Sequence, residues 1–395
     1  MRRVVYSYKN NLLSVTKLWL SWPKHIHHFT TTKDPLSLSN PDQAGNQLGY
    51  YELQEKESIQ IRYMVDSYIP NKSHSLTNEE KTFYLRSTEL VPITNDIKEL
   101  AQSLVKDTTS IYKQAYILFE HLVLQYSYLY PPKERGALSF LRDKKGDCGE
   151  FSFLYSALCR SLGIPCRTMI GCWAVGSMQA HVWNEVFIEG KGWLPVDCSM
   201  ANVQKKKPWQ FVISSLRTLQ WKKYFGETEG QRIVFSVDTE IPLTPIYPSA
   251  SSEILKNYPK YAVILGGKPL VWGYETFHDT APFMQPAYIK FHEENLTHNS
   301  FKSTIQAFWL NPYFGRWTVY ETGWQRFLYI LKHISGFLAV IMIGLHTLFP
   351  NDIFLIIQQL SLILLSLSFV LRKERIVLFG ILTTIFLLFT IRLIV

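Results

Sequence analysis

The sequence GDCGEFSFLYSALCRSLG, residues 146–163, decides the fold of the central part of this chain. Its apolar residues recur at the spacing of one helix face, at Phe151, Leu154, Ala157, Leu158 and Leu162. Asp147 is a favourable N-cap, and Glu150 places a carboxylate in the first turn. We therefore predict a helix that begins at Cys148. The unpaired amides and the positive dipole end at that position favour the thiolate that a nucleophilic cysteine needs.

A strand and its return follow at a distance that suits a histidine base. In residues 180–188, AHVWNEVFI, side chains alternate between an apolar face and a face that carries His181, Trp183 and Glu185. This predicts a half-buried strand with His181 on its non-core face, Trp183 as a shield for the imidazole and Glu185 as a structural residue. Residues 189–192 read as a hairpin turn, and residues 193–197 as the return strand.

The length of that turn decides whether three side chains can meet. The chain order of Cys148, His181 and Asp197 is that of a nucleophile, a base and an orienting acid. A four-residue turn would pair Asn184 with Asp197 and put the acid on the face opposite His181. A turn of three or five residues, or a bulge, puts both on one face, because a slip of one residue swaps the faces. We predict one of these arrangements.

Four blocks of this sequence resemble the core of the bacterial transglutaminase-like superfamily. They are GDCGE, LGIPCR, HVWNE and GWLPVD, at residues 146–150, 162–167, 181–185 and 192–197. The blocks come in the order of the family, within a stretch from about Leu90 to Leu243. The resemblance implies a papain-like α+β core with Cys148 as nucleophile, His181 as base and Asp197 as the group that orients it. Cys198 departs from the family, which often has proline there.

The implied reaction is acyl transfer through a thioester. The Cys148 thiolate would attack an amide carbonyl of a peptide or protein, and His181 would protonate the leaving amine. Transfer to water gives a cysteine protease or amidase, which we favour, and transfer to a lysine gives a transglutaminase. A further alternative is an inactive scaffold that binds a peptide in a membrane complex. Tyr126 or Tyr128 could line the oxyanion position, with packing in the core as an equal alternative.

Composition narrows the class of protein. The 395 residues suffice for two or three domains, and 47% hydrophobic with 14% aromatic residues can fill their cores. Five cysteines without a CxxC pair indicate a reducing compartment, with no disulfide framework, no zinc site and no cofactor expected. The net charge of +9 comes without a nucleic-acid motif, so no nucleic-acid partner is predicted. Lysines at 205–207 and 222–223 are interpreted as solvated loops or a patch near anionic lipid.

The chain is predicted to be an α+β protein in four regions. They are a small β domain, a transglutaminase-like catalytic core, an aromatic-rich extension of unknown role and about three transmembrane helices, at residues 1–75, 76–245, 246–325 and 326–395. Polar residues interrupt the stretch Leu12–Trp22, so we expect no cleaved signal peptide. His25, His27 and His28 suggest a metal site, but no nearby acid or cysteine completes one, and we interpret them as surface histidines.

Within these regions the patterns predict individual elements. Strands are expected at residues 4–8, 48–53, 58–65, 261–265 and 287–291, and helices at residues 94–105 and 111–126. Residues 43–46 weakly resemble a turn in the β domain that precedes the core in many bacterial members of the superfamily.

Three apolar runs near the C-terminal end are long enough to span a bilayer, at residues 327–349, 353–371 and 376–395. Lys332 and His333 in the first run would have to snorkel or lie near an interface. With three spans, the basic loop 372–375 lies on the side of the soluble part, and the positive-inside rule places the catalytic domain in the cytoplasm. If the first run only lies at the interface, two spans remain and the same rule places the domain outside. We disfavour that alternative, because it requires export without a signal.

Overall fold

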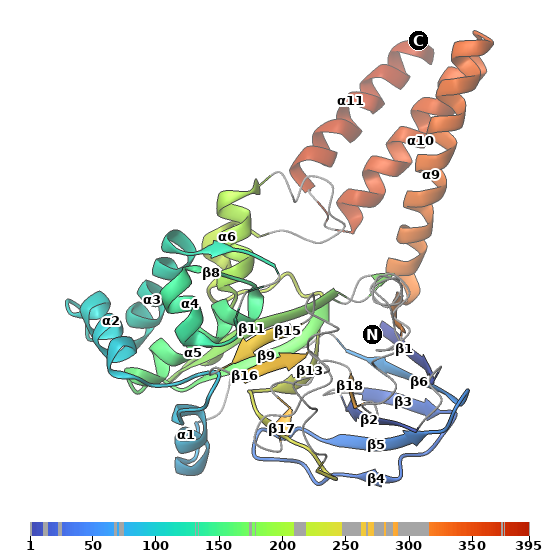
Figure 1. Ribbon diagram of the computed structural model, residues 1–395. Helices are drawn as coiled ribbons and strands as arrows, with labels where there is room; N and C mark the ends of the chain where they lie inside the picture. Colours follow the sequence, from blue (N-terminus) through green and yellow to red (C-terminus); the bar gives the residue numbers. More distant parts are fainter. Residues whose placement is uncertain are drawn as a thin grey trace. The chain divides into compact units, whose positions relative to one another are not determined.

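The structure is a computed structural model of the 395-residue chain (Figure 1). It describes residues 2–10, 15–22, 26–66, 69–70, 75–130, 132, 134–173, 176–177, 179–208, 219–246, 262–265, 268–271, 280–281, 287–290, 316–372, 374 and 376–394. The chain divides into two compact units. One covers most of the chain as far as Val319, and the other contains the C-terminal helices from Tyr320 onward.

A four-stranded antiparallel sheet is the centre of the first unit. Its order is β12-β11-β9-β13, from strands Gly192–Val196, Gln179–Ile188, Cys166–Trp173 and Arg232–Val237. One face of this sheet packs on helices α2, α3 and α5, which are Asn95–Val105, Ile111–Gln125 and Cys148–Ser161 (Figure 1). The α+β class is therefore confirmed, and α2 and α3 lie where the periodicity placed them.

Helix α5 begins at Cys148, as its sequence predicts. The Asp147 side chain accepts the Gly149 N–H at 2.7 Å, and Glu150 completes a capping box with the backbone of Asp147. Gly163, at a φ of +75°, follows the C-terminal end of the helix. Nearly every residue from Gly149 to Arg160 is buried, so α5 is enclosed by other elements rather than exposed along one side.

The hairpin β11–β12 has the register that the triad requires. Ile188 pairs with Gly192 and Asn184 with Val196, so three residues form the turn and Asp197 follows on the His181 face. The prediction of a three- or five-residue turn is confirmed. The prediction of a half-buried strand is wrong, because both faces of β11 are covered. Val186 packs against the helices, while Trp183 lies in a second core on the opposite face.

The second core explains why the strand is covered on both sides. It joins Trp183, Trp193 and Met169 of the sheet to Tyr84 of α1, the helix Asn78–Leu85. The sequence analysis did not predict α1. Glu185 on this face pairs with Arg167 at 2.7 Å, and Arg167 lies over the Trp193 ring at 4.0 Å. Glu185 is thus part of the packing of this face.

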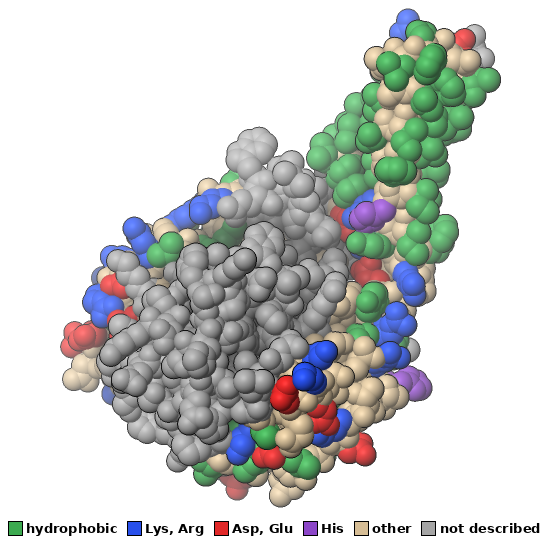
Figure 2. All heavy atoms as spheres, turned by 45° about the vertical axis from the view of Figure 1, so that its right-hand side comes forward, with side chains coloured by type: hydrophobic (Ala, Val, Ile, Leu, Met, Phe, Trp, Pro, Cys, Tyr) green, Lys and Arg blue, Asp and Glu red, His purple; other side chains and the backbone are tan. Residues whose placement is uncertain are grey.

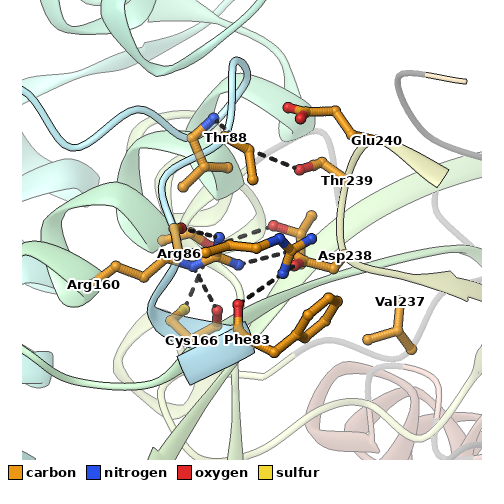
Figure 3. Close-up of polar contacts among 12 residues, drawn as sticks. Phe83, Arg86, Thr88, Arg160, Cys166, Val237, Asp238, Thr239 and Glu240 are labelled. Carbon is orange, nitrogen blue, oxygen red and sulfur yellow. Dashed lines mark hydrogen bonds and ion pairs between the residues drawn. The ribbon is translucent and has the colours of Figure 1, made fainter. Parts of the chain in front are cut away.

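A buried ion-pair group holds the end of α5 that is farthest from Cys148. Arg160 donates to Asp238 at 2.7 Å and to the Cys166 carbonyl at 3.0 Å (Figure 3). Arg86, which follows α1, pairs with the other oxygen of Asp238 at 2.6 Å. Because Asp238 follows β13, these contacts tie α1, α5 and the sheet together and restrict movement of the helix along its axis.

Two further sheets are built mainly from the N-terminal residues. One has the order β10-β19-β1-β6-β3 and the other β18-β2-β5-β4. Their strands are Gly176–Ser177, Arg316–Glu321, Arg2–Lys9, Ser58–Val65, Ile26–Thr31, Ala287–Lys290, Thr16–Ser21, Leu48–Leu53 and Ser37–Leu38. Two of these strands, β18 and β19, come from the aromatic-rich region, which thus completes sheets begun at the other end of the chain. The boundaries at residues 75, 245 and 325 stay predictions.

The remaining elements are short. They are β7, β8, β14, β15, β16, β17, α4, α6 and η2, at Ser127–Tyr128, Lys145–Gly146, Ile241–Pro242, Ala262–Leu265, Lys268–Val271, Thr280–Ala281, Ala137–Asp143, Cys198–Lys206 and Trp221–Tyr224. Strands β15 and β18 fall where the sequence predicts strands.

The second unit contains three apolar helices, α9, α10 and α11, at Gly323–Leu348, Asp352–Leu371 and Ile376–Ile394. Within the described residues, α9 and α10 are long and apolar enough to cross a membrane, and α11 contains a shorter apolar stretch. Figure 2 shows apolar side chains covering these helices, and Phe337 is 71% exposed. Such an apolar surface is unusual for a protein in water.

Lys332 has an acidic partner, and the two predicted alternatives for it, snorkelling or a place near an interface, stay predictions. Its ammonium pairs with Glu374 at 2.9 Å, and Glu374 also accepts from Arg372 at 2.8 Å. Both partners follow α10 and lie in the same compact unit. The charge in α9 is therefore neutralised by an ion pair that is almost fully buried.

Candidate active site

The thiol of Cys148 lies at the strand that carries His181. The Val182 N–H donates a hydrogen bond to the Cys148 sulfur. The ladder between β11 and β12 stops at Asn184, so the sulfur contacts β11 just beyond the end of that ladder. Asn184 fixes the helix above it, since its amide donates to the Ser152 carbonyl at 3.0 Å. The start of α5 is thus held against β11 at the predicted base.

His181 is bonded to Asp197 through one ring nitrogen. The Nε2 and Oδ2 atoms lie 2.6 Å apart, and each residue is only 2% exposed. An ionised carboxylate accepts a proton at Nε2, which leaves Nδ1 as the basic nitrogen of the neutral ring. Asp197 is thus bonded to His181, while the Cys148 sulfur lies at the backbone of the next residue, Val182. The assignment of the three residues as a triad stays a prediction.

Asp197 combines two roles that the sequence presented as alternatives. Its Oδ1 atom caps α6, accepting the Met200 N–H and the Ser199 hydroxyl, each at 2.9 Å. Its Oδ2 atom receives His181 and also Arg232 at 2.8 Å. Burial by itself would raise the pKa of Asp197, but His181 and Arg232 outweigh it and hold the pKa below the ordinary range.

Arg232 belongs to a buried group that we name the Arg232 cluster: Arg232, Glu229 and Asp197. Glu229 takes two hydrogen bonds from the Arg232 guanidinium, at 2.7 and 2.9 Å. It also accepts the indole N–H of Trp173 at 3.2 Å. The Trp173 ring stacks on the His181 imidazole with centroids 4.0 Å apart, closer than the 5.9 Å of Trp183. Trp173 is thus the nearer shield of the imidazole.

A second buried group, the Arg135 cluster, lies at the start of α5: Arg135, Asp147 and Glu150. One guanidinium nitrogen reaches Asp147 at 2.9 Å and Glu150 at 3.0 Å. Burial would raise the pKa of both acids, but Arg135 and hydrogen bonds hold the pKa of Asp147 below its usual value. For Glu150, burial raises the pKa well above its usual value. The Arg135 charge opposes this shift, and the Asp147 charge adds to it. Glu150 is the protonated member of the pair.

Two glycines of the GDCGE block leave room for this cluster. A Cβ atom at Gly146 would lie 2.6 Å from the Cβ of Glu150, and one at Gly149 would lie 3.0 Å from the Arg135 guanidinium. Real carbon atoms do not approach as closely as the first distance. The spacing of glycines around Asp147 and Cys148 is therefore a packing requirement.

The predicted thiolate is not favoured in this structure. Burial first, and the Asp147 carboxylate second, raise the pKa of the Cys148 thiol well above its ordinary value. The Val182 N–H and Arg135 act in the opposite direction but do not reverse the shift. The sequence argument counted the helix dipole but not the desolvation or the adjacent N-cap charge. The resting sulfur is thus a neutral thiol that needs a base.

Several residues around the site were missed by sequence reasoning. Arg135 is 12 residues from Asp147 and Glu229 is 56 residues from Trp173 in the chain. Trp173 itself was only the end of a predicted strand. One signal was present for Trp173: it lies two residues from Gly171, the strand partner of His181, and so shares its face.

Two tyrosines and the histidine-rich segment were also candidates. Tyr126 packs in the core against Phe140, whereas Tyr128 lies near the thiol, and burial followed by the Cys148 charge raises its pKa. His27 lies 3.2 Å from Asp66 at the surface, and His25 is outside the described residues. No group of three or more potential metal-ligating side chains is found among the residues that the structure describes.

Comparisons with known proteins cover the fold and the sequence. A candidate cysteine protease from Cytophaga hutchinsonii is 13% identical, with a TM-score of 0.41, over 60% of this chain and 80% of that one. The periplasmic domain of TgpA from Pseudomonas aeruginosa, bound to ethylmercury, is 15% identical, with a TM-score of 0.31, over 53% of this chain and 92% of that one. Among curated proteins, none matches the sequence.

The sequence of residues 98–198 matches the family model of the transglutaminase-like superfamily. The matched range includes the GDCGE block, α5 and the hairpin as far as Asp197. Residues 98–198 of this chain therefore form a transglutaminase-like domain.

Proposed function

We propose that this protein is a membrane-anchored cysteine hydrolase that cleaves peptide or protein amides. Cys148 is the nucleophile, His181 the base and Asp197 the acid that orients the imidazole. The observation that carries the proposal is the 2.6 Å bond between His181 and Asp197, beside a thiol that accepts the N–H of Val182. Enzymes of this superfamily are often cysteine proteases or transglutaminases, which supports the same class of reaction.

The proposed reaction begins with a proton transfer because the resting thiol is neutral. His181 takes the proton from Cys148 at Nδ1, and the sulfur attacks the amide carbonyl. The carbon–nitrogen bond then breaks as His181 returns the proton to the leaving amine, and a thioester remains. Water, deprotonated by His181, attacks the thioester and releases a carboxylic acid and the Cys148 thiol. Asp197 stays ionised throughout and stabilises the imidazolium.

The negative charge that forms on the carbonyl oxygen needs donors. The amide of Cys148 belongs to the first turn of α5, where N–H groups have no acceptor within the helix. Tyr128 is a second candidate donor, because its phenol lies near the sulfur and stays neutral. We include both in the proposed oxyanion site.

Labelling of the full-length protein in detergent tests whether Cys148 is a reactive thiol. Iodoacetamide should label Cys148 faster than Cys159 or Cys172, which are buried. A Cys172→Ala variant is the matched control, since it removes a thiol from the neighbouring strand and should keep the activity. Labelling of Cys148 no faster than that of the two buried thiols would contradict the enzyme proposal and leave a binding scaffold.

A glutamine-containing peptide separates hydrolysis from transfer. We expect wild type to release ammonia or cleave the peptide, and Cys148→Ala to do neither. Incorporation of an added primary amine in place of hydrolysis would instead identify a transglutaminase. The two reactions share all steps up to the thioester, so the acceptor alone distinguishes them.

We also propose that α9, α10 and α11 anchor the protein, with the catalytic domain in the cytoplasm. The support is the apolar surface of the helices and the basic residues between α10 and α11, set against a loop between α9 and α10 that carries no Lys or Arg. Protease added to intact cells should leave the catalytic domain uncut, and cleavage should require lysis. Cleavage without lysis would place the domain outside.

A further inference from the structure

We infer that Glu229 and Arg232 are positioning residues that set the pH range in which the Cys148–His181 pair reacts. The inference rests on the proposed triad. It adds two residues that touch neither the reacting sulfur nor the substrate, but act through Asp197 and Trp173.

The contacts of the Arg232 cluster hold the imidazole on two sides. Arg232 pairs with the same Asp197 oxygen that bonds His181, so it holds that oxygen in place. Both carboxylate oxygens of Glu229 accept hydrogen bonds from Arg232. One of them also accepts the indole N–H of Trp173, whose ring stacks on the imidazole. Glu229 thus supports two contacts of His181. Through Arg232 it supports the Asp197 bond to the ring nitrogen, and through Trp173 it supports the stacking on the ring face.

The cluster has an unbalanced charge that the imidazolium would complete. Arg232 contributes one positive charge, while Glu229 and Asp197 contribute two negative charges. Arg232, Glu229 and Asp197 are all at most 5% exposed, so water screens their charges poorly. A net negative charge of one therefore faces the Cys148–His181 pair, so a change in this charge alters how readily the pair releases a proton.

Two other groups that face the cluster are neutral. Tyr224 of η2 lies near the cluster, and burial, followed by the Glu229 charge, raises its pKa. Cys198 at the start of α6 has its pKa raised by burial and by Asp197. On the far side, β11 and α5 contribute the reacting pair itself, together with the Arg135 cluster around Asp147. Arg232 and Glu229 are thus the charges that can be changed without altering the triad.

Charge removal should move the pH profile in opposite directions for the two residues. Glu229→Gln removes a negative charge, so protons leave the Cys148–His181 pair more easily and the profile moves to lower pH. Arg232→Gln removes a positive charge, and the profile moves to higher pH. For buried charges one residue away from the pair, we expect each shift to be about one pH unit. The pair titrates as a unit, so these directions hold wherever its proton resides.

The test is the pH dependence of Cys148 alkylation by iodoacetamide, measured on the full-length protein by mass spectrometry. The double variant Glu229→Gln, Arg232→Gln restores the charge balance, so its profile should return to the wild-type position. Peptide turnover by the double variant should stay several-fold below wild type, because the contacts on His181 are lost. Glu227→Gln, two residues from Glu229 but exposed at the surface, is the matched control and should not shift the profile, because water screens its charge.

The outcomes separate this inference from the proposed function. Shifts of equal sign, or none, in the folded single variants would overturn the positioning role even if wild type cleaves peptides. Opposite shifts in a protein that cleaves no amide would keep the positioning role and reject the hydrolase. If Arg232→Gln does not fold, the Glu229→Gln shift and its reversal in the double variant carry the test.

Discussion

The Arg135 cluster and the Arg232 cluster contain the same side chains, one arginine, one aspartate and one glutamate, and both are buried. In each, the aspartate caps a helix: Asp147 caps α5 and Asp197 caps α6. They differ in the partner that completes them. The Arg232 cluster bonds the His181 imidazole, whereas the Arg135 cluster lies beside the Cys148 thiol.

That difference determines where the proton resides. At the start of α5, two acids share one guanidinium, so Glu150 keeps its proton and the charges of Arg135 and Asp147 balance. Beside His181, the surplus negative charge can be balanced by an imidazolium, so the cluster acts on the reacting pair. The same three residue types therefore give a structural anchor in one place and a source of electrostatic control in the other.

The largest contrast is expected when each aspartate is changed to asparagine. Asp197→Asn removes the charge that orients and stabilises the imidazolium, and kcat should fall by about 10⁴-fold. Asp147→Asn keeps an oxygen for the cap, so kcat should fall by about tenfold or less. Steady-state kinetics on a cleaved peptide measure both. Equal losses in the two variants would show that the clusters are not functionally distinct.

Stability should respond most strongly at the other cluster. Arg135→Met leaves the Asp147 charge buried without its cation, and the free energy of unfolding should fall by about 3–5 kcal/mol. Denaturant titration of the detergent-solubilised protein measures this change. Arg142→Met is the control, since Arg142 lies at the surface, where water screens its two ion pairs, so the stability should change far less. A similar loss in both variants would contradict the anchoring role.

The proton on Glu150 gives a dependence of stability on pH. Its pKa is raised above the ordinary 4.5, so the folded state binds a proton that the unfolded state releases. This contribution is full below pH 4.5 and is lost as the pH rises toward the raised value. Glu150→Gln needs no proton, so its stability relative to wild type should grow between pH 5 and pH 8 by on the order of 1 kcal/mol. A constant difference across that range would mean that Glu150 is ionised.

The smallest effect on kcat is expected at the hydrogen bond between Trp173 and Glu229, which has no equivalent among the described contacts of the Arg135 cluster. Trp173→Phe keeps a ring on the imidazole but loses the N–H that bonds to Glu229. A hydrogen bond of about 1 kcal/mol corresponds to a loss of about fivefold in kcat. Trp183→Phe is the comparison, because its ring lies farther from His181 and should change kcat less. A larger loss at Trp183 would reverse the order of the two shields.

Local patterns predicted the parts of this site that are close in sequence. Capping residues located the start of α5, and alternation with a three-residue turn put His181 and Asp197 on one face. The pattern could not show Arg135 or Arg232, because an ion pair between distant residues leaves no periodic signal. The thiolate prediction failed for a related reason: burial of Cys148 is a property of the packed structure and opposes the local dipole.

Pairing between strands that are distant in sequence could not be predicted either. Strands β18 and β19 complete sheets begun by residues 2–65, and their pairing across more than two hundred residues follows from topology rather than composition. The C-terminal helices were easier to predict from the sequence, because a long run of apolar residues by itself indicates a membrane-spanning helix.

The ion pair between Lys332 and Glu374 sets how much of α9 can face hydrocarbon. The uncharged apolar part that follows it runs from Ile334 to Leu348, which at 1.5 Å per residue is about 22 Å long. A typical hydrocarbon layer is about 30 Å thick. Helix α9 as a whole has 26 residues and is long enough to cross that layer. In the proposed anchor the Lys332–Glu374 pair would therefore lie just inside one edge of the hydrocarbon, which is tolerable because the pair is neutral as a whole.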